Sequence, residues 1–213
     1  MVPGRPLLEQ RLRQGLQRLQ LEVTDHQVGL LLTYAGLLER WNRAYNLTAV
    51  TEAADIVDRH LLDCLAVAPY LRGQYFIDVG TGPGLPGIAL AIALPGKFFV
   101  LLDSNGKKTR FLFQARLALG LSNIQEVQAR VESYRPERNF DGVISRAFAS
   151  LATMVDSCHH LLADSGRFYA MKGRFPKQEL SQLVKPYNVC TSHRLQIPGL
   201  DEDRHLIEIG NAP

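Results

Sequence analysis

The sequence predicts an α/β fold in which a mostly parallel sheet of seven strands is covered by helices on both faces and preceded by further helices. From Tyr75 onward, short apolar segments of strand length alternate with segments of helical periodicity, which is typical of a parallel sheet with right-handed crossovers. The first apolar segment ends at Asp78 and leads directly into a loop with four glycines, Gly80, Gly82, Gly84 and Gly87. A strand followed by such a loop is typical of a ligand-binding sheet.

We expect the first 75 residues to form a helical segment that packs on the sheet. Residues 24–27 (Thr-Asp-His-Gln) make a capping-box start, and apolar residues follow at helical spacing as far as Trp41. A polar break leads to a further helix over about 52–69, which ends at Pro69. The chain is therefore divided into an N-terminal helical segment (1–75) and a core that carries the ligand site (76–213).

The core is expected to contain its elements in alternating order. Strands are predicted over 75–80, 97–103, 123–129, 140–147 and 167–173, with helices over 87–94, 106–119, 150–162 and 176–185. An irregular segment around 131–139 takes the place of one helix. The tail is predicted to form two strands, 188–198 and 204–211, joined by a turn, and so an antiparallel hairpin at one edge of the sheet.

Composition excludes several classes of protein. The chain has 213 residues, of which 46% are hydrophobic and 21% charged, as in ordinary globular domains. Its apolar runs are far shorter than the roughly 20 residues of a membrane span, and the first ten residues contain no apolar core of signal-peptide length. Its three scattered cysteines (Cys64, Cys158, Cys190) form no C-x-x-C pair, which excludes a disulfide framework and a zinc knuckle. We expect a cytoplasmic monomer without a metal or a membrane partner.

The glycine loop matches the dinucleotide fingerprint G-x-G-x-x-G, with an acid about 20 residues further on. It is no P-loop, because Ile88-Ala89 follows Gly87 where a P-loop has Lys-Ser/Thr. Pro83 and Pro86 lack the N–H groups that a diphosphate needs, and Asp78 would bring a carboxylate close to it. These features favour a ligand with cationic groups, S-adenosylmethionine (SAM), over NAD.

In this interpretation two acids at strand ends bind SAM. Asp78 attracts the α-ammonium group, while Gly80 and Gly82 let the backbone approach the amino-acid end. Asp103 accepts hydrogen bonds from the ribose hydroxyls, as in other Rossmann-like proteins. The alternative role for Asp103, which is compatible with binding, is the N-cap of the helix that begins near Asn105.

Basic residues follow the ends of the predicted strands. Residues 1–75 carry as many basic as acidic side chains, so the whole excess of +3 lies in 76–213. The cations at the strand ends are Lys107, Lys108, Arg130, Arg146, Lys172 and Arg174. Crowded around a cationic cofactor, they favour an anionic partner such as a nucleic acid. The alternative is that they pair with the neighbouring acids Asp78, Asp103, Glu132 and Asp141.

The absence of two known motifs reduces the choice of the atom that accepts the methyl group. The chain has no Asn/Asp-Pro-Pro-aromatic tetrad for an exocyclic amine and no Pro-Cys pair for attack on a pyrimidine carbon. The fourth strand ends instead at Ser145 and Arg146. Guanine N7 has an exposed in-plane lone pair and no proton, so its methylation requires positioning rather than a general base. From chemistry alone, N7 is permitted.

Six segments together resemble a known family, the bacterial small-subunit rRNA methyltransferase G, once called glucose-inhibited division protein B. They are "RWNRAYNLT" (40–48), "RHLLDCL" (59–65), "FIDVGTGPGLPGIALAI" (76–92), "LLDSNGKKTRFL" (101–112), "FDGVISRAFASL" (140–151) and "GRFYAMKG" (166–173). The resemblance implies a class I methyltransferase fold, with SAM-dependent methylation of a guanine N7 in 16S rRNA. Cys64 stands where the family often has Ser.

The resemblance also implies roles for individual residues. It places the SAM contacts on Gly80, Leu85, Val131, Glu132 and Arg146, and Asp103 fits the ribose acid of the fold. The residues expected at the methyl-transfer site are Arg130, Arg146 and Lys172. Those expected to contact RNA are Lys107, Lys108, Arg130, Lys172 and Arg174.

Two other functions stay open from the residues alone. One is a SAM-dependent enzyme with a small-molecule acceptor, against which the cations at the strand ends argue. The other is an RNA-binding protein without enzymatic activity that uses the fold as a scaffold.

Overall fold

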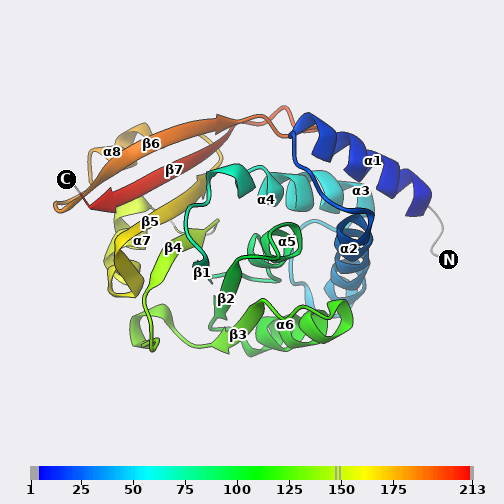
Figure 1. The fold of residues 1–213 in the computed structure, drawn as a ribbon, viewed down its shortest axis with the longest axis horizontal. Coiled ribbons are helices and arrows are strands. Elements are labelled where there is room, and N and C mark those ends of the chain that lie inside the picture. Colours follow the sequence, from blue (N-terminus) through cyan, green and yellow to red (C-terminus); the bar gives the residue numbers. More distant parts are fainter. Residues whose placement is uncertain (1–4, 147, 149, 212–213) are drawn as a thin grey trace.

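A computed structural model describes residues 5–146, 148 and 150–211 of the chain. Its seven-stranded sheet has the order β3-β2-β1-β4-β5-β7-β6 (Figure 1). The strands are β1 (Tyr75–Val79), β2 (Phe98–Asp103), β3 (Ile124–Gln128), β4 (Phe140–Ser145), β5 (Leu162–Lys172), β6 (Tyr187–Leu195) and β7 (Arg204–Asn211). Neighbouring strands among β1–β5 are parallel, and β7 is antiparallel to both β5 and β6. The predicted fold class is confirmed, and of the two strands of the C-terminal hairpin β7 pairs with β5 while β6 lies at the sheet edge.

Strand order reverses at β1, which lies between β2 and β4. Both faces of β1 are buried, because Phe76 contributes to one apolar core and Ile77 to the other. The chain leaves β1 toward one side of the sheet and returns to β4 on its other side. This reversal opens a crevice at the carboxyl ends of the strands, where ligands bind in sheets of this kind.

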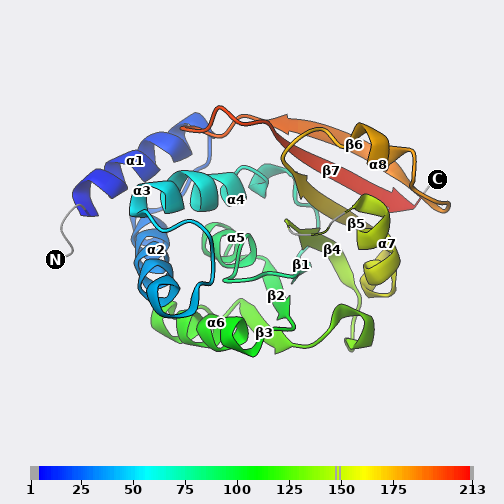
Figure 2. The same ribbon diagram turned by 180° about the vertical axis from the view of Figure 1, so that it is seen from behind.

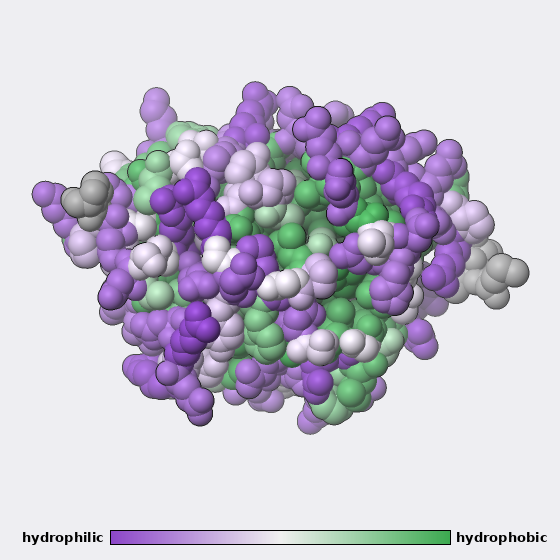
Figure 3. Space-filling view, viewed as in Figure 1, coloured by the Kyte–Doolittle hydropathy of each residue, from purple (hydrophilic) through white to green (hydrophobic). Residues whose placement is uncertain are grey.

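Helices cover the two faces of the sheet unequally (Figures 1 and 2). The helices α5 (Gly87–Ala93) and α6 (Gly106–Leu119) share the larger core with the N-terminal helices. The other face is covered by α7 (Leu151–Cys158), the short turn η4 (His159–Leu161) and the segment that contains η3 (Val131–Ser133). Of the apolar surface visible in Figure 3, most gathers in the half of the molecule that holds α2 and α6.

The N-terminal part consists of α1 (Arg5–Arg18), α2 (Asp25–Tyr45) and a helical run over 53–65. The capping box predicted at Thr24 and Gln27 is present. The helical run combines α3 (Ala53–Asp55), the π-helical η1 (Ile56–Leu62) and α4 (Asp63–Leu65), and the turn η2 (Ala68–Tyr70) follows. The predicted helix over 52–69 therefore ends earlier, at Leu65. The division of the chain at residue 75 stays a prediction.

Two predicted boundaries in the second half are wrong. The helix expected over 150–162 gives way after Cys158 to a 3-10 turn, and β5 begins at Leu162 rather than at Arg167. The helix expected over 176–185 is reduced to α8 (Lys177–Leu180), because residues 181–185 continue as turns and coil towards Pro186, which cannot extend a helix. Ala147, the last residue of the predicted fourth strand, lies outside the described residues, as do residues 1–4.

Close packing of β1 against β4 predicts opposite effects for two glycine substitutions. A Cβ on Gly142 of β4 would lie 2.5 Å from the Phe76 ring and 2.9 Å from the Tyr169 ring, so Gly142→Ala should lower the free energy of unfolding by about 1–3 kcal/mol. Gly36, exposed in the middle of α2, has nothing within 4 Å of its Cβ position, and Gly36→Ala should raise the same quantity by up to about 1 kcal/mol. Denaturant unfolding of both variants checks this packing. Equal stability of the two would contradict it.

Candidate functional site

A cavity of about 190 Å³ lies at the carboxyl ends of β1–β4, beside the point where strand order reverses. Its lining comes from the last residues of the strands and from the loops that follow them, and consists of Val79, Gly80, Leu102, Asp103, Ser104, Ala129, Arg130, Val131, Glu132, Ser145 and Phe148. We call it the first cavity. Of the predicted cofactor residues it contains Gly80, Asp103, Val131 and Glu132.

The glycine loop after β1 is folded upon itself. Gly80, Gly82 and Gly84 have positive φ angles of 69°, 61° and 95°, which L side chains rarely adopt. The N–H groups of Gly80 and Thr81 donate to the carbonyl of Leu102, at 2.9 and 3.1 Å. Those of Gly84 and Leu85 both donate to the carbonyl of Thr81. Leu85 itself is buried in the larger core.

Asp78, at the end of β1, lies beneath this loop. Its Oδ2 accepts hydrogen bonds from the Thr81 hydroxyl at 2.6 Å and from the Gly87 N–H, in the first turn of α5, at 2.8 Å. Its Oδ1 is buried and has no hydrogen-bond partner among the described residues. Burial raises the pKa of Asp78 to about 6, against the hydrogen bonds from Thr81 and Gly87, which lower it. A buried carboxylate oxygen of this kind favours a ligand that brings a hydrogen-bond donor or a positive charge.

Asp103, at the end of β2, is tied to both neighbouring loops. Its Oδ2 accepts from the Gly82 N–H at 2.9 Å and lies 3.6 Å from the Lys108 ammonium, while its Oδ1 accepts from the Asn105 N–H at 2.8 Å. Asp103 is not the N-cap of α6, because that position belongs to Asn105, whose side chain accepts from the Lys107 N–H. Each carboxylate oxygen of Asp103 has a second lone pair for a ligand hydroxyl.

The N-terminal helices also reach the loop. The hydroxyl of Tyr34, fully buried in α2, donates to the carbonyl of Pro83 at 2.8 Å. The side chain of Gln27 donates to the carbonyls of Ile92 and Ala93, where α5 ends. The helices before residue 75 therefore fix both the glycine loop and the helix that follows it.

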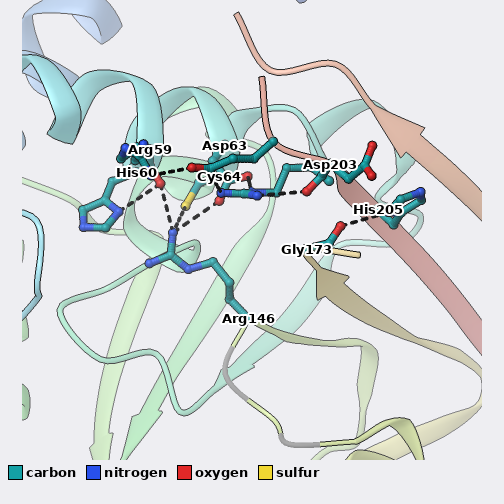
Figure 4. A network of polar contacts seen from close by, with 10 residues as sticks. Arg59, His60, Asp63, Cys64, Arg146, Gly173, Asp203 and His205 are labelled. Carbon is teal, nitrogen blue, oxygen red and sulfur yellow. Dashed lines mark hydrogen bonds and ion pairs between the residues drawn. The ribbon is translucent and has the colours of Figure 1, made fainter. Parts of the chain in front are cut away.

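Arg146 follows β4 and is surrounded by polar groups of the helical run 53–65 (Figure 4). Its Nη1 lies 3.4 Å from Asp63 Oδ2, 3.4 Å from the carbonyl of Arg59 and 3.9 Å from the thiol of Cys64. The other oxygen of Asp63 accepts from Arg204 Nε, at the start of β7, at 3.1 Å. Burial raises the pKa of Asp63, and the two arginines oppose that shift. A buried carboxylate thus holds two guanidinium groups.

Arg146 and Asp63 line a second cavity, of about 370 Å³, beside the ends of β4, β5 and β6 and the start of β7. The other residues of this second cavity are Val50, Arg59, His60, Met171, Lys172, Gly173, Leu195, Arg204 and His205. His60 is neutral at physiological pH, because burial, aided by Arg146, lowers its pKa to about 4. Its Nδ1 lies 3.0 Å from the Arg59 carbonyl and its Nε2 lies 2.8 Å from the Thr48 hydroxyl, so Nδ1 carries the proton and Nε2 accepts from Thr48.

The predicted RNA-contacting cations fall into two groups. Lys172 pairs with Glu179 at 2.9 Å and is only 12% exposed, and Lys108 pairs with Asp103. Lys107, Arg130 and Arg174 are exposed and form no ion pair within the described part of the chain. The alternative that these cations pair with the acids at the strand ends is therefore correct for Lys108, which pairs with Asp103. Lys172 pairs with Glu179, which is not among those acids.

Sequence reasoning missed the residues that line the second cavity from the N-terminal side. His60 and Asp63 lie in the segment "RHLLDCL" (59–65), for whose polar residues the family resemblance implies no role, and Tyr34 lies within a helix predicted to pack on the sheet. The signal available was a histidine and an aspartate three residues apart, with the apolar Leu61 and Leu62 between them. Their roles depend on Arg146 and Arg204, which lie far away in sequence.

Two further structural features concern residues 5–146, 148 and 150–211. No helix there is long and apolar enough to cross a membrane. The same residues contain no group of three or more His, Cys, Asp or Glu side chains placed to hold a metal ion.

Known proteins resemble this chain in sequence and in fold. The profile of a family described as rRNA small subunit methyltransferase G matches residues 27–207. Proteins named ribosomal RNA small subunit methyltransferase G are 53% identical in Salmonella arizonae, over 93% of this chain and 96% of that protein, and 52% identical in Saccharophagus degradans, over 95% and 91%.

Among solved structures, TrmN from Thermus thermophilus has a TM-score of 0.57 at 18% identity, covering 82% of this chain and 53% of that one. The glycopeptide N-methyltransferase MtfA, solved with SAM, has a TM-score of 0.62 at 11% identity, covering 72% and 88%. These likenesses confirm the predicted class I methyltransferase fold.

The raised pKa of Asp78 predicts how stability depends on pH in the ligand-free protein. Its folded pKa of about 6 exceeds the ordinary value of 3.8, so the folded state binds the proton more tightly. The free energy of unfolding therefore falls as pH rises between these two values, and the loss persists above pH 6. Asp78→Asn keeps an acceptor for Thr81 and Gly87 but removes the charge, and should be more stable than wild type at pH 7.5, by up to about 3 kcal/mol.

At pH 4 the two proteins should have nearly equal stability. Thermal unfolding at both pH values, with the exposed Asp164→Asn as the matched control, measures the difference. A variant that is less stable than wild type at pH 7.5 would show that the carboxylate charge stabilises the loop.

Proposed function

The chain belongs to the family of rRNA small subunit methyltransferase G, and we propose that it transfers a methyl group from SAM to N7 of a guanine in 16S rRNA. The observation that carries the proposal is the buried Oδ1 of Asp78 beneath the glycine loop, which has no hydrogen-bond partner among residues 5–146, 148 and 150–211. Membership of the family indicates rRNA as the substrate, and the buried carboxylate of the site favours a cationic methyl donor. The other parts of the proposal are a cytoplasmic, monomeric enzyme with a helical N-terminal part and a SAM-binding core.

The amides of the glycine loop argue against a dinucleotide. Every N–H from Gly80 to Gly87 is already used: four donate to the carbonyls of Leu102 and Thr81, and those of Gly82 and Gly87 donate to Asp103 and Asp78. Pro83 and Pro86 have none. A diphosphate would therefore meet two carboxylates and no free amide donor, whereas SAM carries no phosphate.

The predicted cofactor residues would contact SAM along its length, and four of them, Gly80, Asp103, Val131 and Glu132, line the first cavity. Asp78 Oδ1 would accept from the α-ammonium group, and Arg146 would hold the α-carboxylate. Asp103 would accept from the ribose hydroxyls, and Val131 and Glu132 would border the adenine. Gly80, Gly82 and Leu85 would supply the backbone surface between these ends. When bound, SAM supplies an electrophilic methyl group on a sulfonium ion.

The acceptor N7 has no proton to lose, so the protein needs no general base. Arg130, Arg146 and Lys172 would orient the target nucleotide, and catalysis would consist mainly of holding N7 in line with the methyl group. The exposed cations Lys107, Arg130 and Arg174 would neutralise phosphates, with Lys108 and Lys172 close by. Binding of RNA should therefore weaken as salt concentration rises.

Deletion of the gene tests the reaction. We expect 16S rRNA from the deletion strain to lose one 7-methylguanine, which borohydride and aniline treatment followed by primer extension reveals as a missing cleavage band. A plasmid with the wild-type gene should restore the band, and one with Asp103→Ala should restore it poorly because SAM binds less tightly. A band that persists in the deletion strain would refute the proposed reaction.

The pH dependence of SAM binding tests the role of Asp78. Only the ionised carboxylate attracts the ammonium group, and the pKa of Asp78 is about 6. The association constant should therefore rise by up to tenfold per pH unit as pH approaches 6 from below, and level off above about pH 7. Calorimetry on Asp78→Asn should show weaker binding with little of this dependence, while Asp164→Asn behaves as wild type. An unchanged affinity in Asp78→Asn would exclude this contact.

A further inference from the structure

We propose that the second cavity binds the target guanine and that Asp63 selects it, by accepting hydrogen bonds from guanine N1–H and the N2 amine. The inference rests on the proposed function and adds a pocket and a specificity-determining residue to it. It starts from four observations: the position of the second cavity, its set of donors and acceptors, the charge of its residues, and the remaining capacity of Asp63.

The two cavities meet at consecutive residues. Ser145, the last residue of β4, lines the first cavity, and Arg146 lines the second. Both cavities lie beside the carboxyl ends of the parallel strands, on either side of the end of β4. A base in the second cavity would therefore be the neighbour of a methyl donor whose nucleoside occupies the first.

The charged side chains that line the second cavity offer many hydrogen-bond donors and few acceptors. Its described charged side chains are Arg59, Arg146, Lys172 and Arg204, which only donate, together with a single carboxylate, Asp63. Guanine has acceptors at O6 and N7 on one edge and donors at N1 and N2 on another. An arginine or lysine can donate to O6 while the N7 lone pair stays free to attack the methyl group, and only Asp63 offers ionised acceptors for N1–H and the N2 amine. Adenine has no amine at C2 and no proton on N1, so it cannot make the same pair of bonds.

Asp63 retains the capacity for these bonds. Its Oδ1 accepts from Arg204 at 3.1 Å and its Oδ2 lies 3.4 Å from Arg146, so each oxygen keeps a lone pair for another donor. The two arginines hold the carboxylate in place, and its side chain is 5% exposed, as part of the cavity wall. A base that offers no hydrogen-bond donor to this carboxylate binds poorly, because the free energy cost of burying the carboxylate is then not compensated.

Acids outside the lining offset cations of the second cavity: Arg59 and Arg204 pair with Glu202, and Lys172 pairs with Glu179. As the N7 lone pair forms the new N–C bond, the S–C bond breaks and its electron pair stays on sulfur, so the positive charge passes to the base. Asp63 brings a negative charge to the cavity in which the base becomes cationic, and His60 is neutral there. His60 therefore adds no repulsion toward the methylated guanine.

A chemical double-mutant cycle tests the inference. The target guanosine, once mapped, is replaced by inosine, which lacks the N2 amine, and kcat/KM is measured on both RNAs. Wild type should prefer guanosine by about 10- to 150-fold, the range for loss of one hydrogen bond to a charged group. Asp63→Asn should lower the rate on guanosine by a similar factor and show a preference below about twofold. Its dissociation constant for SAM should stay within about threefold of wild type.

Two further variants separate recognition from positioning. Glu202→Gln removes the exposed carboxylate that pairs with Arg59 and Arg204 at 3.0 and 2.8 Å, and should keep the full preference for guanosine. Asp63→Glu keeps a negative charge between the arginines but displaces the carboxylate, and should lose the preference, which provides a second test if Asp63→Asn fails to fold.

A wild-type preference that persists in both Asp63 variants, or no preference in wild type, would overturn the inference. Failure of wild type to methylate guanosine would instead refute the proposed function.

Discussion

The hydrogen bonds that the buried carboxylate of Asp78 accepts from Thr81 and Gly87 are the interaction on which the site depends. They join the end of β1, the glycine loop and the start of α5 at a single oxygen atom. Because a Cβ on Gly87 would meet both Leu101 and Asp78, only glycine lets the helix begin this close to the strand. The cost of burying this charge remains uncompensated at Oδ1, as expected of a group kept for a ligand rather than for stability.

The site as a whole is built by two parts of the chain. The sheet supplies acids and glycines at the ends of β1 and β2, and the N-terminal helices supply Tyr34, His60 and Asp63. Arg146 joins these parts, since it follows β4 and contacts the helical run 53–65. A local π-helix, η1, includes Arg59 and His60 and ends just before Asp63, and all three residues line the second cavity. The N-terminal helices, for which the sequence predicts only packing on the sheet, thus form one wall of the site.

Much of the fold follows from local sequence signals. Periodicity and the glycine loop predicted the element order, the C-terminal hairpin and the acids at the ends of β1 and β2, because these depend on residues close together in the chain. Contacts between residues far apart in sequence could not be predicted from it. Examples are Asp63 with Arg204, Tyr34 with Pro83, and Lys172 with Glu179. The helix predicted over 176–185 is present but shortened to α8, because residues 181–185 form turns and coil before Pro186.

The central claim is that the glycine loop and its buried acid hold the amino-acid end of SAM while the second cavity lies beside the methyl group. A crystal structure of the protein with S-adenosylhomocysteine tests it most directly. We expect the ligand ammonium nitrogen at about 3 Å from Asp78 Oδ1, with the adenine beside Val131 and Glu132. A bound ligand that leaves Asp78 Oδ1 without a partner, or whose sulfur faces away from Arg146, would contradict it.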